Sequence, residues 1–251
     1  MSKLKSLVRK FLSDEQILQN RKKILFAQNQ AARLYAGNLK KLALIFGSDK
    51  WGDHWYCQHY ETYLQHLRDK KINLLEIGIG GNDDPKLGGN SLRMWRRYFP
   101  KGQIHGLDIA DKCINKASRI HIHRGSQADP DFLREVAAKI GEIDVIIDDG
   151  SHMNEHVIIS FQTLFPLLKS GGWYIVEDTE TAYYKDFGGN SEDRDGAPSS
   201  INFFKDLIHG LHYKDYELDD YEPSYYDENI LSIHFFHNMV FIHKGDNSTT
   251  Y

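Results

Sequence analysis

The stretch Asp144-Val145-Ile146-Ile147-Asp148-Asp149-Gly150-Ser151-His152 decides the fold and the site. An apolar run of strand length ends in two acids, a glycine and a histidine. Charge at the end of a buried strand is costly unless a cation or a ligand compensates it. A second run, Trp173-Tyr174-Ile175-Val176, leads directly into Glu177-Asp178. If these strands are parallel neighbours, their acids meet at the carboxyl edge of the sheet, where open α/β folds bind ligands.

Composition excludes several classes of protein. The chain has 251 residues, 41% of them hydrophobic and 26% charged, as is usual for a globular enzyme. A net charge of -4 gives no footprint for nucleic acid. Cys57 and Cys113 are expected to be buried thiols in a reducing compartment. No segment has the pattern of a secretory signal or a membrane span, which predicts a cytoplasmic protein without membrane insertion.

Strands and helices are expected to alternate from residue 72 onward. Helical stretches lie between the apolar runs, for example Glu155 to Leu168, with Gly171-Gly172 where that helix should stop. This alternation predicts a parallel sheet with both faces covered, closed by an antiparallel hairpin whose tip is His237-Asn238. The five parallel strands are expected at 73–77, 104–109, 120–123, 145–149 and 173–177, and the hairpin strands at 230–236 and 239–243.

Two further segments flank this core. Residues 1–46 are expected to form a helical arm for packing, subunit contact or capping of the active site, and residues 47–251 the catalytic domain. The segment 47–63 is rich in aromatic residues and histidine and is expected to form a pocket wall, with Tyr56 facing a substrate. The loop between Tyr183 and Ser200 is either a lid over a substrate or a solvated loop.

A nucleotide site is indicated by the turns after the first three strands. Gly78 and Gly80 form a glycine-rich turn that lets a ligand approach the backbone. Asp83 replaces the third glycine of a dinucleotide fingerprint, and Glu76 suits a cationic ligand group, which argues against an NAD-linked oxidoreductase. Asp108 is placed to accept ribose hydroxyls. Together with polar residues from Gly125 to Asp129, these signals favour S-adenosylmethionine.

Several of these motifs resemble the metal-dependent sugar O-methyltransferases of macrolide biosynthesis, over roughly residues 42 to 245. The likeness is carried by the segments Glu76–Gly81, Gly88–Trp95, Asp148–His152 and Glu177–Thr179. It implies a Rossmann-like class I methyltransferase fold with a seven-stranded, mostly parallel sheet. It also implies methylation of a sugar hydroxyl on a glycoside, saccharide or glycosylated natural product, with S-adenosyl-L-methionine and Mg²⁺ as cofactors.

The resemblance also implies roles for particular residues. Mg²⁺ falls on Asp149, Glu177 and Asp178, and the general base on His152. Substrate contacts are expected at Tyr56, Tyr183, Tyr184 and His237, and the protein is expected to be a homo-oligomer. The cofactor positions are Glu76, Gly78, Ser91, Asp108, Gln127 and Asp148. For Asp148 the alternative is a structural role, in which it holds a turn or contacts another site residue.

Alternative functions stay open at this point. A catechol-type O-methyltransferase uses the same metal with two phenolic oxygens and predicts a flat apolar slot. A non-catalytic member of the fold, associated with a hydroxylase, is the alternative outside enzymes. A panel of glycosides and a catechol, each with Mg²⁺ and with chelator, distinguishes them.

Overall fold

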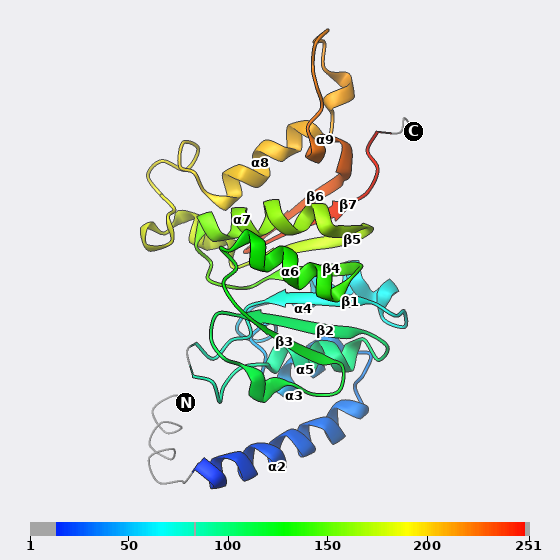
Figure 1. Cartoon of the computed structure of the whole chain (residues 1–251), viewed down its shortest axis with the longest axis vertical. Helices are drawn as coiled ribbons and strands as arrows, with labels where there is room; N and C mark the ends of the chain where they lie inside the picture. Colours follow the sequence, from blue (N-terminus) through cyan, green and yellow to red (C-terminus); the bar gives the residue numbers. More distant parts are fainter. Residues whose placement is uncertain (1–13, 83, 249–251) are drawn as a thin grey trace.

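The computed structural model describes residues 14–82 and 84–248 as a seven-stranded sheet with helices on both faces (Figure 1). The strand order is β3-β2-β1-β4-β5-β7-β6. The first five strands pair in parallel, and β7 is antiparallel to both β5 and β6. The class I methyltransferase fold with its antiparallel C-terminal hairpin is therefore confirmed. The strands are β1 (Asn73–Ile77), β2 (Gln103–Asp108), β3 (Ile120–Arg124), β4 (Ile143–Asp148), β5 (Leu168–Glu177), β6 (Ile230–Phe236) and β7 (Met239–Lys244).

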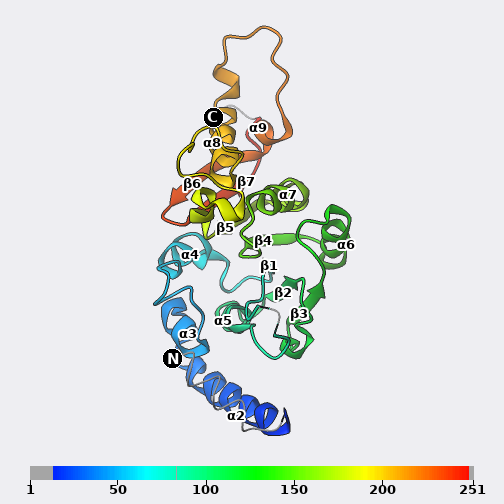
Figure 2. The same cartoon turned by 90° about the vertical axis from the view of Figure 1, so that its left-hand side faces the viewer.

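The helices divide between the two faces of the sheet, as Figure 2 shows. On one face lie α3 (Leu39–Phe46), α4 (Cys57–Leu64) and α5 (Asn90–Tyr98), and on the other α6 (Pro130–Ile140) and α7 (Asn154–Leu164). The central strands are apolar on both faces, because Leu74 packs in one core and Leu75 in the other. The remaining helices are α2 (Asp14–Arg33), α8 (Ser200–Gly210), α9 (Tyr225–Asn229) and the 3₁₀ turns η1 (Gln65–Leu67), η2 (Cys113–Asn115), η3 (Phe165–Leu167), η4 (Thr179–Tyr183), η5 (Lys185–Phe187) and η6 (Tyr213–Asp215).

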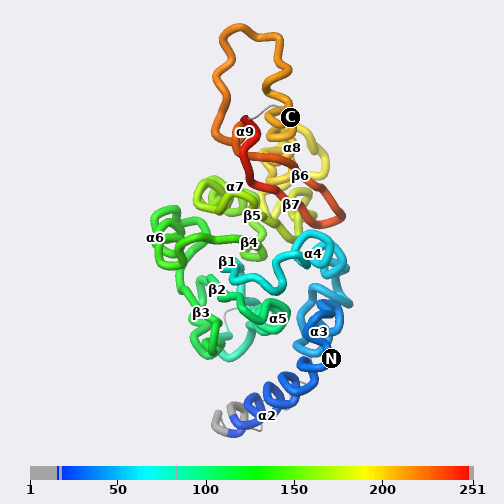
Figure 3. The backbone as a smooth tube through the Cα atoms, turned by 90° about the vertical axis from the view of Figure 1, so that its right-hand side faces the viewer, coloured from blue at the N-terminus to red at the C-terminus, as the bar shows by residue number. Residues whose placement is uncertain are grey.

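The predicted arm is helical where the structure describes it. Helix α2 forms one end of the elongated molecule and packs on α3 (Figure 3). Its Arg21 donates hydrogen bonds to the carbonyl of Lys86 and, over 2.6 Å, to Oδ1 of Asn115, so α2 contacts the loop that follows β1. Residues 1–13 lie outside the described part, and the division into an arm and a catalytic domain at residue 47 stays a prediction.

The expected end of the helix before β5 is wrong. Helix α7 stops at Leu164 and passes into η3, because Pro166 has no N–H with which to continue it. Gly171 and Gly172 lie inside β5 instead of capping a helix. The pairing of β4 with β5 shifts register at this point, and a Cβ on Gly172 would lie 2.8 Å from the carbonyl oxygen of Asp144. The two glycines thus allow an irregularity in the sheet.

The structure also bears on the two cysteines and on the expected absence of a membrane span. Cys57 is buried as expected, but Cys113 is exposed on η2, so the expectation of two buried thiols is wrong for Cys113. Within the described residues, no helix combines the length and the apolar character needed to cross a membrane.

Candidate active site

The site forms where the strand order reverses, between β1 and β4. The turn after β1 and the turn after β4 touch there, because the amide of Asp149 donates to the carbonyl of Ile77 over 2.9 Å. Gly78 has a φ of +88°, and a Cβ at this position would lie 1.9 Å from the carbonyl oxygen of Asp149. Only glycine satisfies both constraints. Such a switch point is where open α/β sheets bind their ligands.

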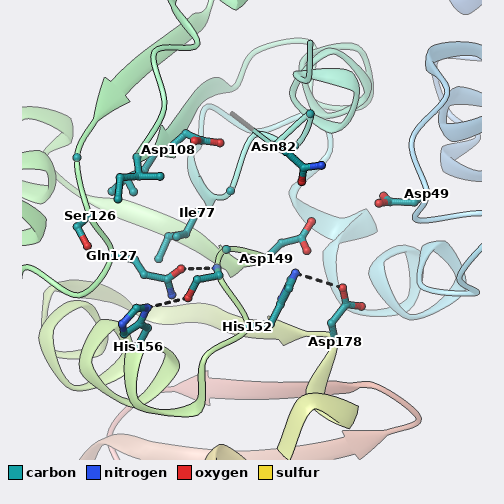
Figure 4. A pocket seen from close by; sticks show the side chains of 18 residues that line it. Asp49, Ile77, Asn82, Asp108, Ser126, Gln127, Asp149, His152, His156 and Asp178 are labelled. Atoms are coloured by element: carbon teal, nitrogen blue, oxygen red, sulfur yellow. Dashed lines mark hydrogen bonds and ion pairs between the residues drawn. The ribbon is translucent and has the colours of Figure 1, made fainter. Parts of the chain in front are cut away.

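Three potential metal-binding side chains meet at this edge: Asp149, His152 and Asp178. One ligand atom from each lies within 4.8 Å of the others. Nε2 of His152 is 3.6 Å from Oδ2 of Asp178, and the two side chains face each other in Figure 4. Both residues have left-handed backbones, with φ of +58° at His152 and +54° at Asp178. Left-handed backbone at non-glycine residues is uncommon and clusters at functional sites.

Glu177 is held by a lysine that the sequence reading missed. The Nζ of Lys50 lies 2.7 Å from each carboxylate oxygen of Glu177 and 2.7 Å from Oδ2 of Asp149. The hydroxyl of Tyr60 also donates to Glu177. Lys50 is fully buried, and burial alone would lower its pKa, but the surrounding carboxylates outweigh that effect and raise the pKa well above its usual value. The three carboxylates therefore favour the charged ammonium form of this lysine.

Glu76 joins the same network from β1. Its Oε1 lies 3.2 Å from Nζ of Lys50, and its Oε2 accepts a hydrogen bond of 2.8 Å from the hydroxyl of Ser91. Burial raises the pKa of Glu76 to about 7, although Lys50 acts in the opposite direction. The sequence predicts a cationic ligand group beside Glu76. In the structure, the cation beside Glu76 is the side chain of Lys50.

A cavity of about 440 Å³ opens beside the three metal-binding side chains (Figure 4). Its wall includes the predicted cofactor residues Gly78, Asp108 and Gln127, and also Asp149, His152 and Asp178. Oδ2 of Asp108 accepts a 3.0 Å hydrogen bond from the amide of Ile79, which ties the acid to the glycine-rich turn. One cavity thus combines the predicted nucleotide side with the predicted metal side.

Gln127 and Asp148 act as a pair. Nε2 of Gln127 donates to Asp148 over 3.1 Å, and its Oε1 accepts a hydrogen bond of 2.6 Å from the amide of Ser151. Asp148 also accepts hydrogen bonds from the hydroxyls of Ser160 and Tyr174, and burial raises its pKa to about 6. Asp148 is 1% exposed and stands behind the cavity wall. Its geometry supports a role through Gln127, and a direct contact with cofactor stays a prediction.

A second cavity of about 300 Å³ adjoins the first at Gly78, Gly80 and Asp149. Ser91, in the first turn of α5, lies in its wall together with Ser48 and Asp49 from the loop after α3. Residues 47–49 begin the segment 47–63 that was expected to form a pocket wall, but the polar residues at its start line this cavity and its aromatic residues do not. The two cavities together offer an elongated space along the turns that follow β1, β2 and β4.

The expected substrate residues do not gather at the first cavity. Tyr56 is buried, and its hydroxyl donates a 2.6 Å hydrogen bond to Oδ1 of Asp178, so it holds a predicted metal ligand. Tyr183 and Tyr184 are partly exposed and line a different cavity of about 420 Å³ with residues 185–187. His237 is exposed at the hairpin tip. Contact of these residues with a substrate stays a prediction.

The loop between residues 183 and 200 is anchored to the first residue of α7. Nδ2 of Asn154 donates to the carbonyls of Thr181 and Phe187 over 3.1 and 2.9 Å. Its Oδ1 accepts a 2.7 Å hydrogen bond from the amide of Ser200. The loop therefore begins and ends at fixed points, and a lid movement between them stays a prediction.

The arrangement fits a divalent cation. Asp149 and Asp178 offer carboxylate oxygens, the ligands that Mg²⁺ prefers, and both side chains are about one-fifth exposed toward the cavity. Burial raises the pKa of Asp149, and Lys50 opposes this. The sulfur-free donor set does not favour a thiophilic metal.

A family model and several known proteins match this chain. The family model described as Rhamnosyl O-methyltransferase/CmcI matches residues 91–197. The chain is 46% identical, over 84% of its own length and 55% of the relative's, to the 8-demethyl-8-alpha-L-rhamnosyl tetracenomycin-C 2'-O-methyltransferase of Streptomyces olivaceus.

Two solved structures of the MycE methyltransferase from the mycinamycin biosynthetic pathway are similar as well. Both are 40% identical to the chain and cover 84% of it and 55% of their own length. One holds Mg and SAH, with a TM-score of 0.81. The other holds Mg, SAH and mycinamycin VI, with a TM-score of 0.77. The chain thus spans about half the length of these relatives.

Proposed function

Because the chain belongs to the Rhamnosyl O-methyltransferase/CmcI family, we propose that it is a methyltransferase domain dependent on S-adenosylmethionine and Mg²⁺. Its acceptor is a sugar hydroxyl of a glycosylated natural product. The observation that carries this proposal is the meeting of Asp149, His152 and Asp178 at the cavity that Gly78, Asp108 and Gln127 also line.

The cofactor side of the proposal rests on the turns after β1, β2 and β3. Asp108 ends β2 and faces the cavity, where a carboxylate accepts the two hydroxyls of an unphosphorylated ribose. The absence of a side chain at Gly78 and Gly80 lets a ligand lie against the backbone. Ser91 lines the second cavity, the remaining place for the amino-acid end of the cofactor, and buried Glu76 accepts a hydrogen bond from the hydroxyl of Ser91.

The metal side of the proposal rests on carboxylate oxygens. Asp149 and Asp178 would hold Mg²⁺, with Glu177 as the third predicted ligand. A bound divalent cation lowers the pKa of an oxygen that it contacts, which an aliphatic hydroxyl needs at neutral pH. Lys50, Tyr56 and Tyr60 hold these acids by hydrogen bonds from outside the cavity.

His152 is the proposed general base. Its ring lies in the cavity wall beside Asp178, and its backbone is left-handed two residues before α7. The imidazole is placed to take the proton of the acceptor hydroxyl. S-adenosylmethionine, when bound, would supply the methyl group to the hydroxyl oxygen, with S-adenosylhomocysteine as the neutral leaving group. Holding both reactants in one cavity supplies much of the rate gain.

The choice of a sugar acceptor rests mainly on the relatives, because the cavity wall mixes polar residues such as Asp49 and Ser151 with apolar ones such as Ile77 and Leu107. The relatives bear names of enzymes that methylate rhamnosyl and mycinamicin hydroxyls, which supports the same class of acceptor.

A direct test incubates the chain with S-adenosylmethionine and a panel of rhamnosides and deoxyhexosyl glycosides, with a catechol as the alternative acceptor. Release of S-adenosylhomocysteine and addition of one methyl group to the acceptor are measured, with Mg²⁺ and with EDTA. We expect methylation of a glycoside that depends on the divalent cation. Failure to bind S-adenosylhomocysteine in calorimetry, or preference for the catechol, would contradict the proposal.

A further inference from the structure

Lys50 is unusual because it is a fully buried ammonium within the predicted metal site. It is 0% exposed and follows α3 in a loop whose backbone is fixed, since the carbonyl of Lys50 accepts a 3.1 Å hydrogen bond from the amide of Cys57. Its Nζ contacts three acids near the ends of three strands. Glu76 is the fourth residue of β1, Asp149 directly follows β4, and Glu177 ends β5. The loop therefore delivers one positive charge to the point where the central strands end.

The contacts of this ammonium fall on groups that a metal would use. Both oxygens of Glu177 and one oxygen of Asp149 lie 2.7 Å from Nζ. Asp149, His152 and Asp178 come within 4.8 Å of one another, and Glu177, turned toward Lys50 and Tyr60, is not in that group. Lys50 thus already neutralises part of the acidic cluster that the metal would otherwise neutralise alone.

Lys50 offsets part of the negative charge at the strand ends. Its ammonium lies 2.7 Å from carboxylate oxygens of Asp149 and Glu177 and 3.2 Å from Oε1 of Glu76. Without the lysine, these three carboxylates would face each other around a buried space, and burying unpaired charge is strongly unfavourable.

We propose that Lys50 is a resident cation of the metal site, which assembles the acids before a metal binds and limits how tightly a divalent cation is held. This inference rests on the proposed metal-dependent function and assigns Lys50 as a positioning residue within it. A positive charge that already contacts Asp149 and Glu177 repels an incoming cation and competes for the same oxygens. The consequence is a site that folds without metal and binds Mg²⁺ reversibly.

The test is the Lys50→Met variant, which keeps the length of the side chain and removes its charge. Mn²⁺ affinity is measured by calorimetry or electron paramagnetic resonance, and the melting temperature is measured with and without Mn²⁺. We expect Lys50→Met to melt lower than the parent without metal, to bind Mn²⁺ at least tenfold more tightly, and to gain more in melting temperature when the metal is added.

Lys244→Met is the matched control. Lys244 is also a buried lysine, but it donates to the backbone carbonyls of Phe165, Pro166 and Leu168 over 3.0, 2.8 and 2.7 Å. It lies at the opposite end of β7 from Met239, the partner of Glu177. We expect Lys244→Met to lose stability equally with and without Mn²⁺ and to keep the Mn²⁺ affinity of the parent.

If Lys50→Met does not fold, a double variant allows the same measurement of Mn²⁺ affinity. Lys50→Met/Glu76→Gln removes one positive and one negative charge and leaves Asp149, Glu177 and Asp178 unchanged. Compared with Glu76→Gln alone, it is expected to bind Mn²⁺ at least tenfold more tightly.

Equal or weaker Mn²⁺ binding in the folded Lys50 variants, relative to their parents, overturns the role of Lys50 and leaves the methyltransferase proposal intact. Absence of Mn²⁺ binding in the parent and in every variant instead refutes the metal-dependent function on which the inference rests.

Discussion

Gly78 and the backbone carbonyl of Asp149 are in such close contact that a Cβ on the glycine would lie 1.9 Å from the carbonyl oxygen. The first residue after β1 and the first residue after β4 are thereby locked together. One of them begins the predicted cofactor turn, and the other is a predicted metal ligand. The two halves of the site share this contact.

Gly78→Ala is expected to damage both halves. The Cβ would push the two turns apart, and the φ of +88° adds backbone strain, so we expect a loss of about 2 kcal/mol or more in the free energy of unfolding. Affinity for S-adenosylhomocysteine should fall at least tenfold in calorimetry. The control is Gly188→Ala, where φ is +79° but no atom lies within 4 Å of the added Cβ, and which should cost about 1 kcal/mol and leave cofactor affinity unchanged. Equal effects of the two substitutions would show that the contact does not matter.

His152→Ala should abolish turnover without weakening the binding of cofactor. Loss of a general base typically costs about 100-fold or more in kcat, and His152 lies beside Asp178 and not on the nucleotide side of the cavity. The measurement is kcat with a glycoside acceptor that the parent methylates, together with the affinity for S-adenosylhomocysteine. His212→Ala removes an exposed histidine outside the site and serves as the control. Substantial turnover by His152→Ala would refute the assignment of the base.

The two sides of the cavity should be separable by a pair of substitutions. Asp108→Ala removes the acid that ends β2, and we expect it to weaken S-adenosylhomocysteine binding at least tenfold while Mn²⁺ binding persists. Asp178→Asn should have the opposite pattern, because Asp178 belongs to the metal-binding group. Calorimetric titration of each variant with both ligands gives four affinities. A pattern in which each variant loses both ligands equally would contradict the division of the cavity.

Stability should depend on pH through a histidine outside the site. Burial, with the neighbouring imidazoles of His121 and His123, lowers the pKa of His105 to about 3. In the unfolded chain its pKa is about 6.5, so below that pH the unfolded chain binds more protons and the folded state loses stability as the pH falls. His105→Leu should remove this contribution, which reaches about 1 kcal/mol per pH unit below about pH 6.

Urea unfolding between about pH 7 and about pH 5 measures this slope for the parent and for His105→Leu. We expect the parent to lose more stability on acidification than the variant does. The exposed His212→Gln variant should retain the slope of the parent. A His105→Leu variant with an unchanged slope would mean that His105 does not stay neutral in the fold.

The sequence predicts the sheet well because its strands are apolar runs bounded by turn residues. β1 occupies the expected residues 73–77, and β6 occupies 230–236. The failure at Gly171 and Gly172 has a local cause, since glycines mark both helix ends and irregular strands, and only the pairing of β5 with β4 distinguishes these. The acids at the ends of β4 and β5 could be predicted because parallel neighbours bring their ends together.

Lys50 could not be predicted in the same way. Its partners Glu76, Asp149 and Glu177 stand 26, 99 and 127 residues away, and nothing in the pattern around residue 50 indicates burial. Tyr56 was expected to face a substrate because of its aromatic surroundings, but in the structure its hydroxyl donates a hydrogen bond to Asp178. A side chain's partner depends on tertiary packing, and residue type alone leaves it open. The role of Glu177 as a metal ligand stays a prediction.

The insertion of β7 between β5 and β6 has a consequence for biosynthesis. Glu177 ends a strand whose outer neighbour, β7, follows it in the chain only after α8, α9 and β6. Until that strand arrives, β5 is an open edge that exposes its hydrogen-bonding groups, and such edges invite pairing with other chains. A nascent polypeptide therefore passes through a stage in which its acidic strand ends are already made but the edge beside them is still unpaired.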